Sequence, residues 1–381
     1  MRIESAELFA LKIPFVMPPM SHSAHRDRGA CDSVVLQLSS AGVRGHGEIV
    51  FRDYVSGAAD REGDPAVRAA AATRRLLEPL AGRDVDWSEA AAEGRVAGPS
   101  DLPIICALET AMLDLACRFS GRDAFEMLGQ EPVRTTIAFS GIVPLLSPAG
   151  AARFLLQFAR AGVRSFKIKL GPDPEANRAV LLACRKEVGE GGDLRVDANG
   201  AWRVADVEEH LAACAAAGVS AVEQPFPVDA AGADTALRRG VERGFLFIAD
   251  EGFLVEDDLV SIARAGTFGM INLRLAKNGG LTRVLRLARL AAGHGIAHQL
   301  GCMAAETGIL SALGRLAAAV LPAPRWVEGG YDGHLYADHL AGRHFGFGSD
   351  GTAPVIRGEG IGYTVRQDAL AALCVSRAKA L

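Results

Sequence analysis

Residues 165–170 read SFKIKL, a short apolar segment of β-strand character that runs into a lysine. The same pattern returns in four later segments, which read LRVD (194–197), AVEQ (221–224), LFIAD (246–250) and MINLRL (270–275). Alanine-rich stretches of helical character separate these segments. Short strands that alternate with helices are typical of βα units around a parallel sheet.

Three further strand patterns, at residues 136–143, 296–300 and 325–328, bring the number of candidate strands to eight. Eight parallel strands, each followed by a helix, match a (β/α)8 barrel, whereas an open doubly wound sheet more often has five or six. We therefore expect an α/β chain with a modified (β/α)8 TIM barrel at residues 131–345.

The sequence on either side of the barrel region has a different pattern. Residues 3–13, 33–38 and 43–50 predict an antiparallel meander, and residues 64–80 and 102–128 predict helices. The tail from about Gly346 is again extended and glycine-rich. A chain of 381 residues also exceeds the usual size of one hydrophobic core. We expect an α+β capping domain at residues 1–130, completed by the tail at 346–381.

Composition excludes several classes of partner. The formal net charge is −4 and no long basic run occurs, so nucleic acid is not an expected partner. No apolar stretch approaches the roughly 20 residues of a membrane span. The start of the chain lacks the order of a signal peptide, so we expect a cytoplasmic protein. Seven cysteines without a C-x-x-C spacing indicate reduced core thiols, with Cys302 kept open because it falls beside a candidate site strand.

Charged side chains recur at the ends of five consecutive strand candidates. They are separated by 28, 26, 27 and 27 residues, and they are Lys169, Asp197, Glu223, Asp250 and Lys277. Steps of one βα unit predict that all five lie at the same height, at the carboxyl-terminal mouth where barrel enzymes place their chemistry.

Three carboxylates between two lysines predict a particular chemistry. Carboxylate oxygens suit Mg²⁺ better than zinc, which prefers nitrogen and sulfur. Without a cation, three acidic groups in one mouth would raise one another's pKa values. A lysine whose pKa is lowered by a nearby cation can act as a base near neutral pH. The pattern predicts a Mg²⁺ site flanked by two lysine bases.

Five ordered motifs resemble those of the muconate-lactonizing-enzyme subgroup of the enolase superfamily: FKIK (166–169), VDAN (196–199), VEQP (222–225), ADE (249–251) and AKNGG (276–280). Residues 51–57 and 107–118 are similar to that subgroup's capping-domain patterns. The resemblance covers nearly the whole chain. It implies abstraction of a proton next to a carboxylate to give an enediolate, with Lys or His bases and Mg²⁺.

The resemblance also implies roles for individual residues. The metal ligands would be Asp197, Glu223 and Asp250. The acid/base pair would be Lys169 and Lys277 on opposite faces of the substrate. Lys167 would hold the substrate carboxylate and tune Lys169, and Asn199 would support the metal or the carboxylate.

Further residues are candidates for substrate binding: Arg26, Cys302, Glu306, Glu328 and Asp332. Cys302 and Glu306 have the alternative of a buried thiol and a supporting carboxylate. Dipeptide epimerases of the subgroup carry an Asp-x-Asp pair that binds a substrate ammonium, whereas the aligned stretch here is Gly330-Tyr331-Asp332. Glu328 is a possible substitute for the first acid. Arg26 belongs to a His- and Arg-containing segment (22–28) that is either a specificity loop or an exposed polar loop.

A base on each face of one carbon is what 1,1-proton transfer needs. The first expectation is therefore an isomerase that racemises or epimerises an amino-acid derivative, either an N-acyl amino acid or a dipeptide. The alternatives are a muconate-type cycloisomerase or an o-succinylbenzoate-type dehydratase, and a non-catalytic binding barrel is disfavoured by the intact lysine and carboxylate set. The expected partner is a small-molecule carboxylate, and because barrels of this subgroup are often oligomeric, we also expect a homo-oligomer.

Overall fold

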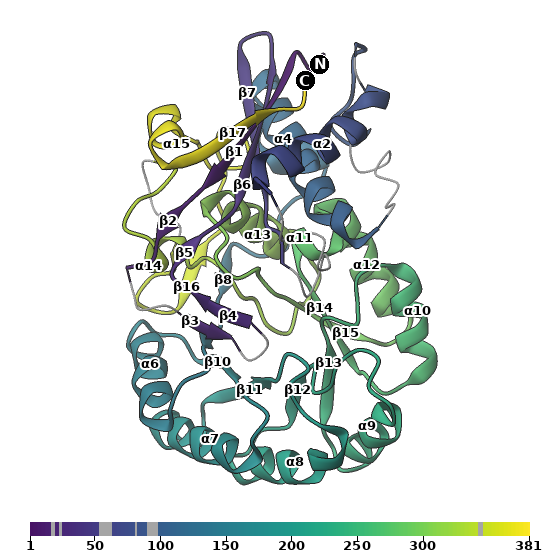
Figure 1. Cartoon of the computed structure of the whole chain (residues 1–381), viewed down its shortest axis with the longest axis vertical. Coiled ribbons are helices and arrows are strands. Elements are labelled where there is room, and N and C mark those ends of the chain that lie inside the picture. The colour runs from purple at the N-terminus through teal and green to yellow at the C-terminus, as the bar shows by residue number, and fades with distance from the viewer. Residues whose placement is uncertain (17–19, 23–24, 53–62, 81, 90–97, 342–345) are drawn as a thin grey trace.

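The computed structural model describes residues 1–16, 20–22, 25–52, 63–80, 82–89, 98–341 and 346–381, with the backbone alone at 20–22 and 25–28. Figure 1 shows a curved sheet surrounded by helices, with a second layer of antiparallel strands and helices above it.

A parallel sheet of seven strands forms the barrel. Its strands, in spatial order, are β15 (Ala297–Leu300), β14 (Met270–Leu273), β13 (Leu246–Ala249), β12 (Ala221–Glu223), β11 (Asp193–Asp197), β10 (Ser165–Lys169) and β9 (Gly141–Val143). Neighbouring strands are all parallel. This order follows the chain, as expected for consecutive βα units.

The eighth predicted strand is reduced to a bridge. Within residues 325–328, only Val327 pairs as a strand residue, with Leu300. The segment nevertheless bonds on both sides, because Leu300 N–H donates to the Trp326 carbonyl (2.9 Å) and Ser140 N–H donates to the Val327 carbonyl (2.8 Å). The modified barrel is therefore completed by an irregular segment between β15 and the residues before β9.

The barrel helices lie outside the sheet (Figure 1). They are α6 (Pro148–Arg160), α7 (Pro174–Val188), α8 (Val207–Ala216), α9 (Ala233–Glu242), α10 (Glu256–Ala265), α12 (Leu281–Gly293) and α13 (Gly308–Val320). Ser147 and Asp173 cap the amino ends of α6 and α7, and a proline follows each cap, which is the favoured arrangement at a helix start. Buried apolar strand residues such as Phe166, Val196 and Val222 pack in one core with side chains of α6, α7, α8 and α9.

The predicted strand at 136–143 is two strands. β8 (Thr136–Ala138) pairs with β16 (Thr352–Pro354), and β9 enters the barrel sheet. The intervening residues bond to different partners, since Phe139 N–H donates to the Gly351 carbonyl and Ser140 N–H to that of Val327. The chain therefore leaves one sheet and joins the other at this point.

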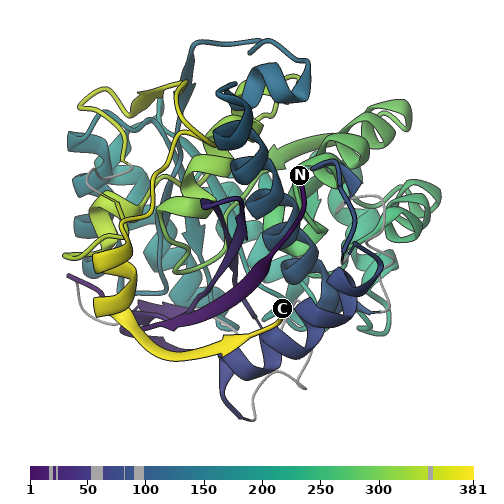
Figure 2. The same cartoon turned by 90° about the horizontal axis from the view of Figure 1, so that it is seen from above.

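The capping layer is an antiparallel sheet in the order β17 (Cys374–Lys379), β1 (Ser5–Leu11), β6 (Val34–Ser40) and β7 (Val43–Ile49). Because the last strand pairs with the first, both ends of the chain lie on this sheet (Figure 2). Helix α4 (Leu102–Ser120) lies very close to β7. A Cβ at Gly47 would lie 1.9 Å from the Ala107 carbonyl oxygen, so only glycine permits this approach.

The predicted helix at 102–128 is interrupted. Gly121 adopts a left-handed conformation and ends α4, and Asp123 begins α5 (Ala124–Leu128) with a capping box to Glu126. The other predicted helix is α2 (Pro65–Leu77), followed by a 3-10 turn at Glu78–Leu80. The remaining elements are β2 (Ile13–Pro14), β3 (Met20–His22), β4 (His25–Arg28), β5 (Ala30–Cys31), α11 (Leu275–Asn278), α14 (Asp332–Leu335), α15 (Gln367–Leu373) and the 3-10 turns Pro99–Asp101 and Val204–Asp206.

Two expectations about the chain as a whole can be compared with the structure. All seven cysteines are free thiols, and five of them are buried. No helix among the described residues is both long enough and apolar enough to cross a membrane.

Candidate active site

Three buried carboxylates lie at the carboxyl ends of adjacent barrel strands. Asp197 ends β11, Glu223 ends β12 and Asp250 directly follows β13. Asp197 and Glu223 are register partners, and all three side chains are fully buried. The row therefore lies at the mouth where the spacing predicts it.

Two cations bridge the row. The Lys167 Nζ atom lies 3.3 Å from both Glu223 oxygens and 3.5 Å from Asp197 Oδ2. Arg274 Nη2 lies 3.2 Å from Glu223 Oε1 and also bonds Asp250. Burial raises the pKa of Glu223, and the Lys167 ammonium opposes that shift only in part. Burial alone would raise the pKa of Asp250, but Arg274 and Lys277 hold it below its usual value.

The two predicted base lysines contact opposite ends of the row. Lys169 Nζ donates to Asp197 Oδ2 (2.8 Å) and to Asn199 Oδ1 (2.6 Å). Lys277 Nζ donates to Asp250 Oδ1 and to the Asp250 carbonyl, both at 2.9 Å. Burial lowers the pKa of Lys277, and the Asp250 carboxylate offsets part of this shift. A lysine with a lowered pKa is suited to accept a proton.

The expectation that Lys277 ends a strand is wrong. Strand β14 ends at Leu273, and Lys277 lies on the short helix α11. The chain turns here because the Asn278 side chain accepts the Arg274 N–H (2.8 Å) and Gly279 adopts a left-handed conformation. Arg274 takes the strand-end position, and Lys277 reaches Asp250 from one helical turn further along.

Two amides hold the ends of the row in place. Gln224 accepts the backbone N–H of Asp250 (3.0 Å) through Oε1 and donates to the Phe226 carbonyl through Nε2. Asn199 accepts from Lys169 and donates to Glu251 Oε1 (3.0 Å). Both amide residues have positive φ, at 35° and 46°, a strained state that often marks functional loops.

Beneath the row, Glu328 joins two buried cations. Its carboxylate accepts from Lys167 Nζ (2.8 Å) and from Arg195 Nη2 (2.7 Å). Burial alone would lower the pKa of Lys167, but Glu223, Glu328 and Asp197 raise it above its usual value. The neighbouring carboxylates therefore favour the charged form of Lys167. The suggested contact between Glu328 and a substrate ammonium stays a prediction, and it would require one of these two cations to move.

The remaining predicted substrate-binding residues are Asp332, Cys302, Glu306 and Arg26. Asp332 is buried at the start of α14, where it pairs with His339 Nδ1 (3.1 Å). Cys302 and Glu306 are half-buried and adjoin each other, since a Cβ at Gly329 would lie 3.4 Å from both. Burial and then the charge of Glu48 raise the pKa of Glu306 to about 8. The side chain of Arg26 lies outside the described residues.

Several polar contacts of the row were not predicted from the sequence. Glu223 accepts from the side-chain amides of Asn272 and Gln299, each at 2.8 Å, in addition to Arg274. Asn272 lies on β14, Arg274 directly follows β14, and Gln299 lies on β15. Asn272 and Arg274 occupy alternate positions of the segment MINLR. Buried polar residues at alternate positions of an apolar strand are the available signal.

The donor set has the chemistry of a Mg²⁺ site. As the side chains stand, the described residues contain no group of three or more His, Cys, Asp or Glu arranged around a metal position. Lys167 and Arg274 lie between the carboxylates instead. Three buried carboxylates that already share cations offer the hard oxygen ligands that Mg²⁺ prefers. The residues fit Mg²⁺ if the two bridging cations give way.

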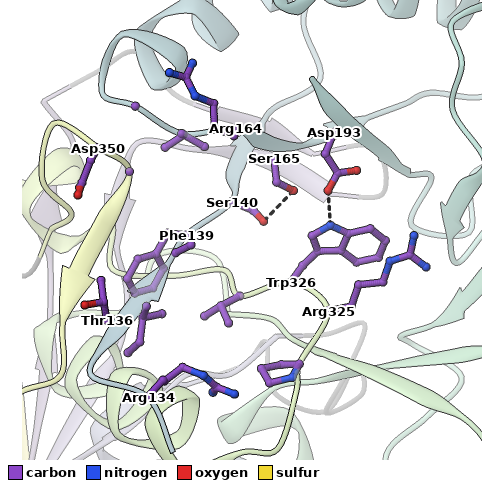
Figure 3. Close-up of a pocket in the computed structure, with 17 residues that line it drawn as sticks. Arg134, Thr136, Phe139, Ser140, Arg164, Ser165, Asp193, Arg325, Trp326 and Asp350 are labelled. Carbon is purple, nitrogen blue, oxygen red and sulfur yellow. Dashed lines mark hydrogen bonds between the residues drawn. The ribbon is translucent and has the colours of Figure 1, made fainter. Parts of the chain in front are cut away.

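A cavity of about 420 Å³ lies at the opposite, amino-terminal end of the barrel strands. It is lined by Arg134, Arg164 and Arg325 together with Asp193 and Asp350. Figure 3 shows that the three guanidinium groups point in different directions, and that Asp193 bonds the Trp326 indole. This cavity is separate from the carboxylate row.

Comparison with known proteins places this site in a family. Over 225 residues the chain is 30% identical to the hydrophobic dipeptide epimerase of Enterococcus faecalis, a match that spans 56% of this chain and 59% of that relative. The L-Ala-D/L-Glu epimerase of Escherichia coli is 28% identical over 84% of this chain and 92% of its own. Muconate cycloisomerase 1 of Pseudomonas putida is 27% identical over 81% and 80%.

Solved structures show the same fold. The N-succinyl Arg/Lys racemase from Bacillus cereus superposes with a TM-score of 0.85 and 20% identity, over 100% of both chains. The dipeptide epimerase from Enterococcus faecalis, in complex with Mg and the dipeptide L-Leu-L-Tyr, superposes with a TM-score of 0.80 and 21% identity, over 96% of this chain and 100% of its own. The model of the family described as "Enolase C-terminal domain-like" matches residues 150–369, more than half of the chain. The motif set and the barrel thus have one explanation, and the chain belongs to the enolase C-terminal domain-like family.

Proposed function

We propose that this protein is a Mg²⁺-dependent isomerase that moves a proton from one face to the other of a carbon next to a carboxylate. The observation that carries the proposal is the contact of Lys169 and Lys277 with opposite ends of one buried carboxylate row. Two bases on different sides of one carbon suit racemisation or epimerisation.

The metal would be held by Asp197, Glu223 and Asp250. When bound, Mg²⁺ would supply positive charge where the substrate carboxylate becomes more negative. The chain's own residues do the rest. One lysine, as the neutral amine, takes the α-proton and becomes an ammonium. The other lysine, as the ammonium, delivers a proton to the opposite face and becomes the amine.

Lys167 has a separate role in this scheme. Its raised pKa favours the ammonium form, so Lys167 would bind the negatively charged substrate oxygens without giving up a proton. Glu328, which Arg195 also bonds, accepts from Lys167. An ammonium held in this way stabilises the enediolate more than the starting acid, because charge develops on the substrate oxygens during proton removal.

The proposed substrate is an N-acyl amino acid or a dipeptide. Support comes from the relatives, which include dipeptide epimerases and, among the structures of the same fold, a racemase of N-succinyl amino acids. Such substrates combine a carboxylate with a Cα–H bond whose inversion is a 1,1-proton transfer.

The second candidate is cycloisomerisation of an unsaturated acid, supported by the similarity to muconate cycloisomerase. There the second lysine would act as a cation beside the intermediate. The lowered pKa of Lys277 favours its use as a base and so favours inversion over this alternative. An o-succinylbenzoate-type dehydration would use the same intermediate and has no separate observation in its favour.

Exchange in D₂O tests the proposal. Each enantiomer of an N-acyl amino acid series, and each epimer of a dipeptide series, is incubated with wild type, Lys169→Ala and Lys277→Ala, with exposed Lys186→Ala as control. We expect each active-site variant to lose inversion, with a fall on the order of 10²–10⁴-fold, and to retain exchange of one enantiomer only. The two variants should retain opposite enantiomers.

Two results would contradict the two-base scheme. One is inversion of both enantiomers by Lys277→Ala at the wild-type rate. The other is exchange of a single enantiomer by the wild type together with a cyclised product, which would support the cycloisomerase instead.

The predicted homo-oligomer and the cytoplasmic location are kept as part of the proposal. Light scattering after size-exclusion chromatography measures the first, and fractionation of cells that express the protein measures the second.

A further inference from the structure

Helix α4 of the capping layer reaches the turn that carries Lys277. Glu109 is 1% exposed on α4. Its Oε1 atom accepts the backbone N–H of Thr282 at 2.9 Å, and it also accepts the Thr282 hydroxyl. The Glu109 carboxylate of the capping layer therefore accepts both the N–H and the hydroxyl of Thr282 in the barrel.

The bonded residue lies at the amino end of α12. That helix begins at Leu281, and its N-cap position is Gly280, which has no side chain with which to cap the free N–H groups. An N-cap side chain normally accepts the N–H two or three residues later. Glu109 supplies this acceptor from a different helix.

The turn between α11 and α12 is shaped around this carboxylate. Gly280 has φ +105°, and a Cβ there would lie 1.9 Å from Glu109 Oε2. A Cβ at Gly279, with φ +83°, would lie 3.0 Å from Leu102 of the same α4 helix. Glycine at 280 fits the close approach of α4, and the positive φ of both residues favours glycine at each position.

Lys277 is only three residues before Gly280. Its Nζ atom is fully buried and donates to the Asn272 carbonyl (2.7 Å) as well as to Asp250. Its place relative to the row depends on where α11 ends, and α11 ends at the turn that Glu109 holds. Movement of the turn by a fraction of a helical step would move the amine.

We propose that Glu109 is a positioning residue for Lys277: through Gly280 and Thr282, the capping layer sets the placement of one of the two bases. The inference rests on the proposed two-base function. It implies that loss of Glu109 affects one direction of proton transfer, whereas general damage to the fold would affect both.

The test compares initial α-proton exchange of each enantiomer in D₂O, before inversion mixes them. Glu109→Leu removes the acceptor at similar volume, and Glu109→Gln restores an acceptor oxygen. The matched control is Thr110→Val, which removes the neighbouring buried hydroxyl on α4 that bonds the Cys106 carbonyl instead. Lys277→Ala identifies the enantiomer that depends on Lys277.

We expect Glu109→Leu to slow exchange of the Lys277-dependent enantiomer on the order of 10–100-fold, the scale of a displacement of about 1 Å. The Lys169-dependent enantiomer should exchange close to the wild-type rate. Glu109→Gln should recover most of the loss, and Thr110→Val should leave the ratio of the two rates unchanged. Equal slowing of both enantiomers by Glu109→Leu, or no slowing at all, would overturn the inference.

A second readout does not need activity. Amide hydrogen exchange of residues 274–284, followed by mass spectrometry, should quicken in Glu109→Leu and stay near wild type in Thr110→Val. If the wild type shows no α-proton exchange, the proposed function fails, and this readout still decides whether Glu109 holds the turn. Should Glu109→Leu not fold, Thr282→Val removes the hydroxyl donor from the other side, and unchanged amide exchange there would overturn the inference.

Discussion

Glu223 is the middle carboxylate of the row. Four side chains donate to it: Lys167, Arg274, Asn272 and Gln299. Such a group is fixed in position before any ligand binds, which lowers the cost of assembling a site. Burial raises the pKa of Glu223 and so disfavours its ionised form. A further cation beside it would stabilise that form.

Replacement of Glu223 by Gln should therefore weaken Mg²⁺ binding while the barrel stays folded. Lys167 keeps Glu328 and Arg274 keeps Asp250 as partners, so neither cation is left buried alone. Mutation of a residue that only supports a metal ligand typically lowers metal affinity about 10–100-fold. For Glu223→Gln we expect a loss of Mg²⁺ affinity at least that large. Isothermal titration calorimetry with MgCl₂ measures it, and circular dichroism checks the fold. Unchanged affinity would remove Glu223 from the ligand set.

Glu306 predicts a pH dependence of stability. Its pKa rises from 4.5 to about 8 in the folded protein. A raised folded-state pKa contributes stability that is fully present below the unfolded value and is lost as pH rises through the folded value. The unfolding free energy should therefore fall between about pH 5 and 8, by roughly 1.4 kcal/mol per unit at most.

Glu306→Gln should flatten this dependence, because the amide does not titrate. Urea unfolding at several pH values gives the difference between wild type and variant, and exposed Glu190→Gln serves as control. Parallel curves for wild type and Glu306→Gln would show that Glu306 ionises freely in the folded state.

At the residue scale, the sequence predicted which residue types lie at the strand ends and how far apart they are. It did not predict the local backbone that carries Lys277. Asp197 and Glu223 end their strands and Asp250 directly follows its own, because one βα unit has a nearly constant length. The equal step to Lys277 was a coincidence of length. Its true position depends on the bond from Arg274 N–H to the Asn278 side chain, which no spacing encodes.

At the scale of elements, the turn before α12 shows how a strand, two helices and the other layer meet. Gly280→Ala should be strongly destabilising, because its Cβ would overlap the Glu109 carboxylate and its φ of +105° is strained for any side chain. We expect a loss of more than about 1–3 kcal/mol, the cost of the backbone strain alone. Activity should fall with it, since Lys277 lies three residues earlier.

Gly293→Ala is the matched control in the same helix. An added Cβ at Gly293 would meet nothing within 4 Å. Alanine is a better helix former than glycine by about 0.8–1.0 kcal/mol, so this variant should be neutral or slightly more stable. Thermal unfolding of both variants measures the contrast. Equal melting temperatures would mean that the turn tolerates a side chain and is not shaped around Glu109.

Long periodic elements were predictable, and interruptions were not. The helix pattern at 102–128 continues in sequence through the point where Gly121 and the Asp123 cap divide it. Likewise the eighth strand pattern became a bridge, although the backbone of residues 326–328 bonds both Leu300 and Ser140. Local periodicity reports which face is apolar, whereas such breaks follow from partners far away in the chain.

At the scale of the whole molecule, the chain ends meet on one sheet, and the tail is tied to α4. Asp114 accepts the backbone N–H of His46 on β7 (3.0 Å), the N–H of Ile361 in the tail (3.1 Å) and Arg118 Nε (3.1 Å). Arg118 in turn donates to the Tyr363 carbonyl (2.8 Å). The sequence predicted that the tail completes the capping layer, but it did not show which strand or helix the tail contacts, because pairing over more than three hundred residues leaves no local pattern.

Asp114→Ala should therefore loosen the tail and the capping layer together. The side chain is 1% exposed, so its loss leaves buried N–H groups without an acceptor and Arg118 without its buried carboxylate partner, beside the exposed Glu359. Breaking a buried charged pair in this way costs about 3–5 kcal/mol, a large part of the total stability of a typical domain.

Urea unfolding measures the loss, and amide hydrogen exchange should quicken in residues 359–381 before it does in the barrel strands. Asp368→Ala is the control, because its pair with Arg366 lies in the same tail but is exposed, so its loss should change the stability little. If the two variants unfold at the same urea concentration, Asp114 does not join the tail to the rest of the molecule.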